Sequence, residues 1–343
     1  MTESLVPRQS PTASSDPLTV LDDVPLSEDE ERYAGAARAA NTLRGYRSDW
    51  KEWCAWCKAE GLPPLPASPA GITRYLAYLA GHGARVGTMS RRLSAIRFAH
   101  QIQNVADPTE HARVVVVWEG IRRTHGAPPE QAEPLMPPEL FDVVARCPTT
   151  RVWKTRGRES EPDLAGHRDR ALLLVGFVAA LRRSELAALT VERVNDHPNG
   201  LVLTIPRSKT NQTGTQTELV VLPRAGNQER CPVQVLERWL ELAAITEGPV
   251  FRRVTKGNRA VKAALNPESI NQLVQQAVAR ADLDPKAYSA HSLRAGFVTY
   301  AHLRGASDRA IAHQTRHRSL ATLGQYVRIH EAWQDNAATL LGL

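Results

Sequence analysis

Residues 291–328 read HSLRAGFVTYAHLRGASDRAIAHQTRHRSLATLGQYVR, and this stretch decides the fold class of the C-terminal half. Its apolar residues recur every three or four positions, the period of an amphipathic helix. The pattern predicts three short helices in succession, over residues 291–306, 307–316 and 319–328.

Polar side chains in the same stretch predict a site. His291 and Arg294 are three residues apart and therefore share one helix face. His317 and Tyr326 are nine residues apart, close enough to meet across a turn between short helices. Cations or donors beside a phenol indicate chemistry on a phosphate without a metal ion.

Upstream of this stretch, the apolar period changes from helix to strand. Residues 163–191 read as a long apolar helical region that carries Arg182 and Glu185 on one face near its end. The β-rich runs GLVLTIP and ELVVLP, which begin at residues 200 and 218, predict two antiparallel strands around a polar loop. Lys209 lies at the mouth of this hairpin, where its flexible ammonium group could reach into a cleft.

The other expected elements are helical. In the C-terminal half, they cover residues 137–147, 231–245, 266–283 and 331–343. In the N-terminal part, they cover residues 27–40, 41–61, 67–83, 86–104 and 108–124, the first with Ser27 and Glu30 in capping-box spacing. We expect a disordered tail over residues 1–27, a helical domain over 28–125, a linker over 126–134 and a second domain over 135–343.

Composition and charge narrow the choice of partner. The net charge is +7, but residues 1–32 carry −6, so the remainder carries about +13. This favours a polyanionic partner, nucleic acid before membrane, although charge alone also fits a basic protein without a nucleic-acid role. No run has membrane-spanning length, no secretory signal is evident and the four cysteines are few, so we expect a cytoplasmic protein.

Two other motifs have simpler interpretations. Cys54 and Cys57 form CAWC, but the tryptophans beside them favour core packing over a redox or zinc site. His313 and His317 have the spacing of a zinc helix, yet Gln314 stands where such a helix needs glutamate. We expect no metal site.

Taken together, these motifs match a known family in order and spacing. ALRRSEL at residue 180, a hairpin lysine, HSLR, a histidine and a tyrosine nine residues later resemble the tyrosine recombinase, or phage integrase, family. NTLRGYRSDWKEWCAWCK at residue 41 is similar to a helix of Cre, so the resemblance covers residues 28–343 and is closest to Cre-like recombinases. It implies a mainly α fold with a small antiparallel sheet, in which a helical core-binding domain and an α+β catalytic domain form a C-shaped clamp.

The resemblance also implies how the reaction proceeds. Arg182 and Arg294 would clamp the scissile phosphate and neutralise charge in the pentavalent state. Tyr326 would attack in line and form a 3′-phosphotyrosine. Lys209 would protonate the departing 5′ oxygen. No metal, ATP or other cofactor is required.

Three further residues would support this chemistry. His291 would hydrogen-bond a phosphate oxygen or help to take the phenol proton, His317 would hold a phosphate oxygen, and Glu185 would orient the histidine and arginine groups. The chain departs from the family at Thr315 and Arg316, where Leu-Gly often precedes the second histidine, and at Ala180, where glycine is frequent. We expect the change at Ala180 to be minor.

DNA contacts are expected from both domains. Two N-terminal helices would face the major groove, and the side chains of the helix from residue 266 would be exposed to read bases. The candidate contacts are Thr42, Arg44, Arg47, Lys51, Arg91, Arg92, Arg97, Glu268, Ser269, Asn271, Gln272 and Gln275.

The resemblance implies double-stranded DNA with an inverted-repeat target site as partner. The protein would be a monomer or dimer before synapsis, and a homotetramer on paired sites that exchanges strands through a Holliday junction. Two alternatives remain open, a type IB topoisomerase-like relaxing enzyme and a non-catalytic DNA-binding derivative of the family. The helical module argues against the first alternative and the full set of chemical groups against the second.

Overall fold

The computed structural model describes residues 27–128, 131–152, 160–206 and 218–317. The chain divides into two compact units, Met1–Pro129 and Glu130–Leu343, and the division falls inside the expected linker. Among the described residues, no helix combines the length and the apolar character needed to cross a bilayer.

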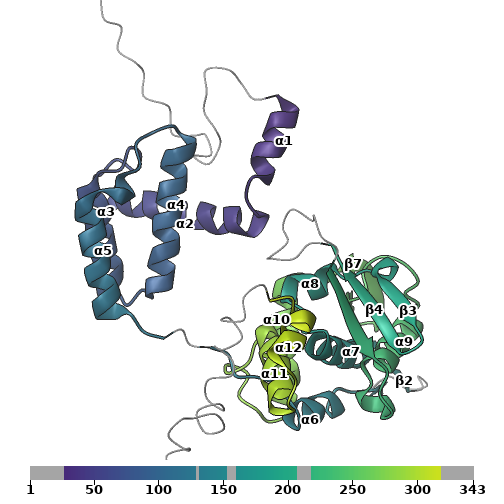
Figure 1. Cartoon of the computed structure of the whole chain (residues 1–343). Helices are drawn as coiled ribbons and strands as arrows, with labels where there is room; N and C mark the ends of the chain where they lie inside the picture. Colours follow the sequence, from purple (N-terminus) through teal and green to yellow (C-terminus); the bar gives the residue numbers. More distant parts are fainter. Residues whose placement is uncertain (1–26, 129–130, 153–159, 207–217, 318–343) are drawn as a thin grey trace, which may run out of the picture. The chain divides into compact units, whose positions relative to one another are not determined.

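The first unit is helical throughout its described part (Figure 1). Its elements are α1 Glu28–Ala36, α2 Ala40–Ala59, α3 Pro69–Gly81, α4 Val86–Ile102, η1 Pro108–Glu110 and α5 Ala112–His125. Its core packs Trp53, Tyr75 and Cys57 from α2 and α3 against apolar residues of α4 and α5. Cys57 is fully buried, so the prediction that CAWC belongs to the core is confirmed.

The first helix begins as its sequence predicts. The Glu30 backbone N–H donates to Ser27 Oγ, and the Ser27 N–H donates to Glu30 Oε2 at 2.8 Å. These reciprocal bonds form a capping box and satisfy two amides that would otherwise lack partners. The capping box expected from the spacing of the two residues is therefore confirmed.

The second unit places a buried helix at its centre. Helix α7, Leu164–Val178, is buried over most of its length and packs against α6, α9, α10 and α11 (Figure 1). The helices of this unit are α6 Glu139–Ala145, α7, α8 Arg183–Ala188, η2 Val191–Arg193, η3 Gln228–Arg230, α9 Pro232–Leu242, α10 Pro267–Arg280, α11 Ala290–Leu303 and α12 Asp308–Thr315.

Three small antiparallel sheets complete the described part of the second unit. The first pairs β1 Thr150–Arg151 with β2 Glu161–Pro162. The largest has the order β3 Val194–His197, β4 Gly200–Ile205 and β5 Glu218–Pro223, with Gly200 opposite Pro223 and Ile205 opposite Glu218. The last pairs β6 Arg252–Val254 with β7 Ala260–Ala264. The predicted fold class, mainly α with small antiparallel sheets, is confirmed, and so is the pairing of the two predicted strands.

The expected single helical region over residues 163–191 is wrong in one respect. It is two helices, because the chain turns between Val178 and Arg183, and Ala180 adopts a left-handed conformation with φ of 47°. A side chain with a Cβ is disfavoured there. The change from glycine to Ala180 is therefore not minor, because it puts a Cβ at a position where the backbone favours glycine.

Candidate active site

The turn between α7 and α8 positions the first predicted pair. Arg182 precedes α8, and its backbone N–H donates to Glu185 Oε2 at 2.8 Å. The Arg182 guanidinium donates to Glu185 Oε1, also at 2.8 Å. Glu185 is buried, whereas Arg182 is partly exposed. The carboxylate therefore holds the backbone and one guanidinium nitrogen of Arg182, while part of the guanidinium stays accessible.

Helix α11 carries the second predicted pair on its first turns. The Ser289 hydroxyl caps this helix by accepting from the His291 backbone N–H. His291 is exposed, whereas Arg294, one turn later, is only 1% exposed. The two side chains therefore differ in solvent exposure, although they lie on one helix face.

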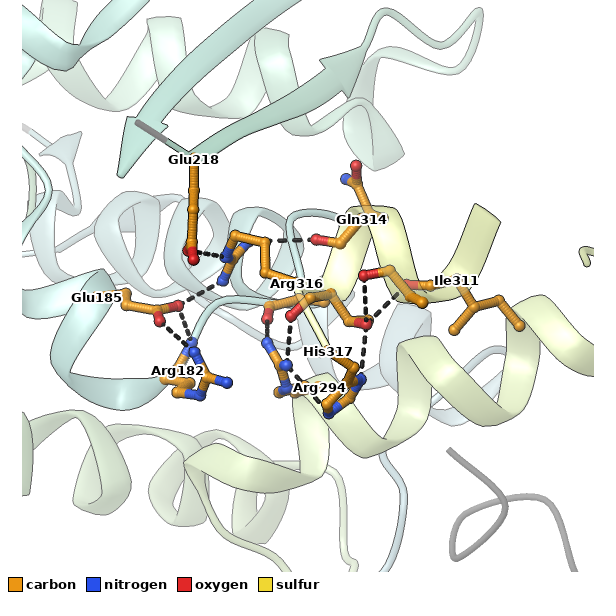
Figure 2. A network of polar contacts seen from close by, with 11 residues as sticks. Arg182, Glu185, Glu218, Arg294, Ile311, Gln314, Arg316 and His317 are labelled. Carbon is orange, nitrogen blue, oxygen red and sulfur yellow. Dashed lines mark hydrogen bonds and ion pairs between the residues drawn. The ribbon is translucent and has the colours of Figure 1, made fainter. Parts of the chain in front are cut away.

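Arg294 joins three segments that are distant in the sequence (Figure 2). Its guanidinium donates to the carbonyl oxygen of Ala180 at 2.6 Å and to that of Thr315. It also donates to His317 Nε2 at 3.2 Å. Both carbonyls lie at helix ends, where backbone oxygens lack helical partners. Arg294 therefore holds the turn before Arg182 and the segment with His317 in one place.

His317 has a defined tautomer in this arrangement. The Thr315 hydroxyl donates to the carbonyl oxygen of Ile311 at 2.7 Å, so its oxygen is left to accept from His317 Nδ1, also at 2.7 Å. Nδ1 then carries the proton, and Nε2 accepts from Arg294. In this state, His317 positions Arg294 and has no Nε2 proton to offer to a phosphate.

The electrostatic setting keeps His317 neutral. Burial lowers the pKa of His317 to about 4, and the positive charges of Arg294, Arg182 and Arg316 add to the effect of burial. For Glu185 the balance is opposite. Burial raises its pKa, but Arg316 and the hydrogen bond from the Arg182 backbone outweigh burial and hold the pKa below its ordinary value.

We expect the folded protein to lose stability as pH falls from about 6.5 to about 4, partly because of His317. The unfolded chain protonates this ring below its ordinary pKa of 6.5, whereas the folded protein leaves it neutral down to about 4. The unfolded state therefore binds more protons in this window. Urea unfolding at pH 7.5 and at pH 5.0 measures the loss, which should be smaller in His317→Gln.

The matched control for this experiment is His313→Gln, at an exposed histidine of α12. It should show the same loss between the two pH values as the unsubstituted protein. An equal loss in all three proteins would contradict the neutral state of His317. Glu185 acts in a lower window, because its lowered pKa removes stability only as pH falls below about 4.5.

Sequence reasoning missed Arg316 and Glu218. Arg316 Nη2 donates to Glu185 Oε2 at 2.5 Å, and Arg316 Nε lies 3.3 Å from Glu218 Oε2 (Figure 2). In the sequence, Arg316 was noticeable only as a departure from the family's Leu-Gly pattern. That departure does not reveal that its partners are Glu185 and Glu218. No neighbouring motif in the sequence indicates that Glu218, the first residue of β5, belongs to the site.

The structure thus brings five of the seven expected catalytic residues into one region of the second unit. Arg182 and Glu185 are bonded to each other, Arg294 and His317 are bonded to each other, and Arg294 reaches the turn before Arg182. His291 follows the cap of the same helix α11. Lys209 and Tyr326 lie outside the described residues, as do the helices expected over 319–328 and 331–343.

The expected DNA contacts of the first unit lie on α2 and α4. Thr42, Arg44, Arg47 and Lys51 are exposed on α2. On α4, Arg91 donates to Asp49 yet stays 57% exposed, and Arg97 is paired with Asp107 at 3.0 Å. Arg92 differs, because it donates to Glu52 and to the Tyr75 hydroxyl, and its side chain is only 16% exposed.

On α10, the expectation of exposed readers is partly wrong. Glu268 and Gln272 are exposed, and Ser269 is half-buried. Asn271 and Gln275 are half-buried, because Asn271 Oδ1 accepts from the Ala290 backbone N–H and Gln275 Nε2 donates to the carbonyl oxygen of Tyr288. These two amides hold the segment before α11, which carries Arg294.

Within the described ranges, no three His, Cys, Asp or Glu side chains are grouped so that they could hold a metal ion. The guanidinium groups of Arg182 and Arg316 bring positive charge to the site, where both pair with Glu185. Such groups suit phosphate oxygens, which they can bind through paired hydrogen bonds.

Comparisons with known proteins point to one family. The profile of the Phage integrase family matches residues 158–332, and the profile of the N-terminal SAM-like domain of phage integrases matches residues 34–102. A protein of Selenomonas ruminantium named "Integrase/recombinase xerD homolog" is 32% identical, over 91% of this chain and 88% of its own length. "Tyrosine recombinase XerC" of Pseudomonas fluorescens is 26% identical, over 84% of this chain and 86% of its own length.

Solved structures share the fold at low identity. XerH recombinase bound to a palindromic difH substrate superposes with a TM-score of 0.60 at 15% identity, over 92% of this chain and 84% of its own. A lambda integrase dimer on a core site gives 0.56 at 15% identity, over 86% of this chain and 91% of its own.

Proposed function

The chain belongs to the phage integrase family and is a site-specific tyrosine recombinase, and from this premise we propose that it cleaves and rejoins DNA with Tyr326 as nucleophile. The observation that carries the proposal is the bonding of Arg294 to Ala180, Thr315 and His317. It gathers Arg182, Arg294 and His317, which the sequence spreads over more than a hundred residues, into one cationic region.

The cleavage step follows from phosphate chemistry. The Tyr326 oxygen attacks the scissile phosphorus in line, and the bond from phosphorus to the 5′ oxygen breaks. The DNA 3′ end becomes a phosphotyrosine, and Lys209 gives its proton to the leaving 5′ oxygen. Arg182 and Arg294 bind the non-bridging oxygens, whose negative charge grows in the transition state. A 5′ hydroxyl of another strand reverses the step.

The two histidines take different parts in this scheme. We assign to His291, which is exposed beside the site, the bond to a phosphate oxygen or the receipt of the phenol proton. His317 keeps the Arg294 guanidinium in place through Nε2. The family resemblance implies that His317 holds a phosphate oxygen. To do so, Nε2 must release the hydrogen bond that it accepts from Arg294 and must carry a proton of its own to donate.

We place Lys209 as the general acid and expect Lys209→Ala to slow strand cleavage about 10²- to 10⁴-fold. Replacement of the leaving 5′ oxygen by sulfur should restore most of the rate, because a thiolate is a far weaker base and leaves without a proton. Single-turnover cleavage of both substrates measures the effect. Lys256→Ala, at an exposed lysine of the same unit, is the control and should cleave both normally. Equal slowing on both substrates would refute proton donation.

The proposed partner is double-stranded DNA with an inverted-repeat target site. XerH and lambda integrase, which share the fold, were solved on DNA, XerH on a palindromic substrate and lambda integrase as a dimer on a core site. We infer that this chain binds its site as a monomer or dimer and pairs two sites in a homotetramer, with strand exchange through a Holliday junction. The names of the relatives favour recombination over the relaxing-enzyme alternative.

The exposed basic side chains of α2 and α4 are the proposed DNA contacts of the first unit, with Arg44, Arg47, Lys51 and Arg91 foremost. In the second unit, the exposed start of α10 offers Glu268 and Gln272. Glu268 is held by Arg183 at 2.8 Å, so its carboxylate already has a partner and Gln272 is the better reader of bases. The similarity of α2 to Cre remains a prediction.

A further inference from the structure

Arg316 occupies a backbone position that disfavours it. It follows the last residue of α12 and has φ of 58° and ψ of 40°, the left-handed conformation that commonly ends a helix. Glycine adopts this conformation without strain, whereas a side chain with a Cβ does not. Its side chain is nevertheless only 5% exposed. A residue that breaks a local rule and is also buried indicates a gain elsewhere.

The contacts of Arg316 are directed at protein groups. Its Nη1 donates to the carbonyl oxygen of Gln314 at 3.2 Å, and its Nη2 donates to Glu185 Oε2 at 2.5 Å. Its Nε lies 3.3 Å from Glu218 Oε2 without hydrogen-bond geometry, so attraction of charge holds this contact. Arg316 therefore faces two carboxylates and is not aimed at a substrate.

Glu185 is shared between two guanidiniums (Figure 2). One carboxylate oxygen accepts from Arg182 Nη1 and the other from Arg316 Nη2. A single carboxylate divided in this way neutralises neither arginine fully. Arg316 thus reduces the hold of Glu185 on Arg182, which the proposed function assigns to the scissile phosphate.

The balance of charge depends on Arg316. The network of Figure 2 contains three positively charged groups, the guanidiniums of Arg182, Arg294 and Arg316. It contains two negatively charged groups, the carboxylates of Glu185 and Glu218. His317 is neutral above a pKa of about 4. This network therefore carries one net positive charge, and without Arg316 it would carry none.

We propose that Arg316 is a positioning residue of the strand-cleavage reaction, which offsets one of the two negative charges of Glu185 and Glu218 so that the network with Arg182 and Arg294 keeps one net positive charge for the phosphate. The proposal rests on the proposed function, because it assumes that this region binds the scissile phosphate. It also gives Glu218, which follows the Lys209 segment in the sequence, a defined partner at the end of α12.

Arg316→Gly tests the proposal with a residue that fits the backbone. We expect DNA binding to stay within about threefold and single-turnover cleavage to fall about tenfold or more, because a positive charge is lost beside the phosphate. Arg316→Gly combined with Glu218→Gln restores one net positive charge, so cleavage should recover to within about threefold of the unsubstituted protein. Unchanged cleavage in Arg316→Gly, or no recovery in the double variant, would overturn the proposal.

A pH profile separates this role from a merely structural one. The charged groups that face His317 are Arg294 and His291 of α11, Arg182 before α8, and Arg316 in its own segment. The positive charge of Arg316 helps to lower the pKa of His317, so loss of Arg316 should raise that pKa. The pH below which cleavage slows should therefore be higher in Arg316→Gly than in the unsubstituted protein. If that pH stays in place while the rate falls, Arg316 has a structural role only.

Three controls complete the design. Arg309→Ala removes the same charge from an exposed position of α12 and should cleave normally once bound. If Arg316→Gly does not fold, the single-turnover cleavage rates of Arg316→Lys and Arg316→Gln test the proposal instead, because only lysine keeps the positive charge. Equal cleavage rates in these two variants would overturn the proposal. If the unsubstituted protein forms no covalent adduct, the proposed function itself fails, whatever the result for Arg316.

Discussion

Tyr326→Phe is expected to form no covalent complex with DNA, whereas the unsubstituted protein forms one that survives denaturation. The variant lacks the phenol oxygen that attacks phosphorus in the proposed mechanism. A nicked duplex traps the complex, because the short strand beyond the cleaved bond diffuses away and the reverse step loses its 5′ hydroxyl. Denaturing electrophoresis with labelled DNA measures the trapped fraction.

Tyr300→Phe is the matched control for this prediction. Tyr300 lies on α11, half-buried beside Phe177, so loss of its hydroxyl should leave adduct formation unchanged. The target site can be selected from duplexes with randomised inverted repeats by covalent capture on the unsubstituted protein. An adduct with Tyr326→Phe, or its loss with Tyr300→Phe, would refute the assignment of the nucleophile.

Arg182→Ala is expected to slow strand cleavage roughly 10³-fold while DNA remains bound. The missing cation would otherwise stabilise charge that develops only in the transition state, where one group of this kind is worth about 10²- to 10³-fold or more. The fold should persist, because Glu185 keeps its bonds to the residue-182 backbone N–H and to Arg316. Single-turnover cleavage at saturating protein measures the step.

Arg183→Ala is the control for Arg182→Ala, because the two arginines are neighbours with different partners. Arg183 is exposed and pairs with Glu268 of α10 at 2.8 Å, and such surface pairs contribute little to stability. Its loss should change cleavage by less than about threefold. Similar rates in the two variants would show that net charge, and not the position of Arg182, governs the step.

The sequence predicted the helices whose apolar residues repeat with a clear period, and the hairpin of β4 and β5. It did not predict the break before α8, because residues 178–183 contain alanine, leucine and arginine, all strong helix formers. Within the break, Glu185 accepts from the Arg182 backbone N–H three residues earlier. A long-range contact accompanies it, because Arg294 binds the Ala180 carbonyl oxygen from 114 residues away. Tertiary contacts of this kind are not visible in a local pattern.

The candidate site was predictable as a set of residues but not as a network. Spacing placed Arg182 with Glu185, and His291 with Arg294, on shared faces. Spacing could not show that Arg294 is buried and bonded to backbone oxygens, nor that Arg316 reaches Glu185 across 131 residues. The short β1, β2, β3, β6 and β7 were missed for a related reason, because strands of two to five residues carry almost no periodic signal.

The buried guanidinium of Arg294 affects how this family should be surveyed for lost activity. It closes the ends of two helices through the carbonyl oxygens of Ala180 and Thr315, and the loss of a buried hydrogen-bonded cation typically costs several kcal/mol. Selection for a stable fold alone would therefore retain Arg294 in descendants that no longer cut DNA. Its presence in a genome survey indicates an intact scaffold, and activity has to be judged from the nucleophile and the general acid.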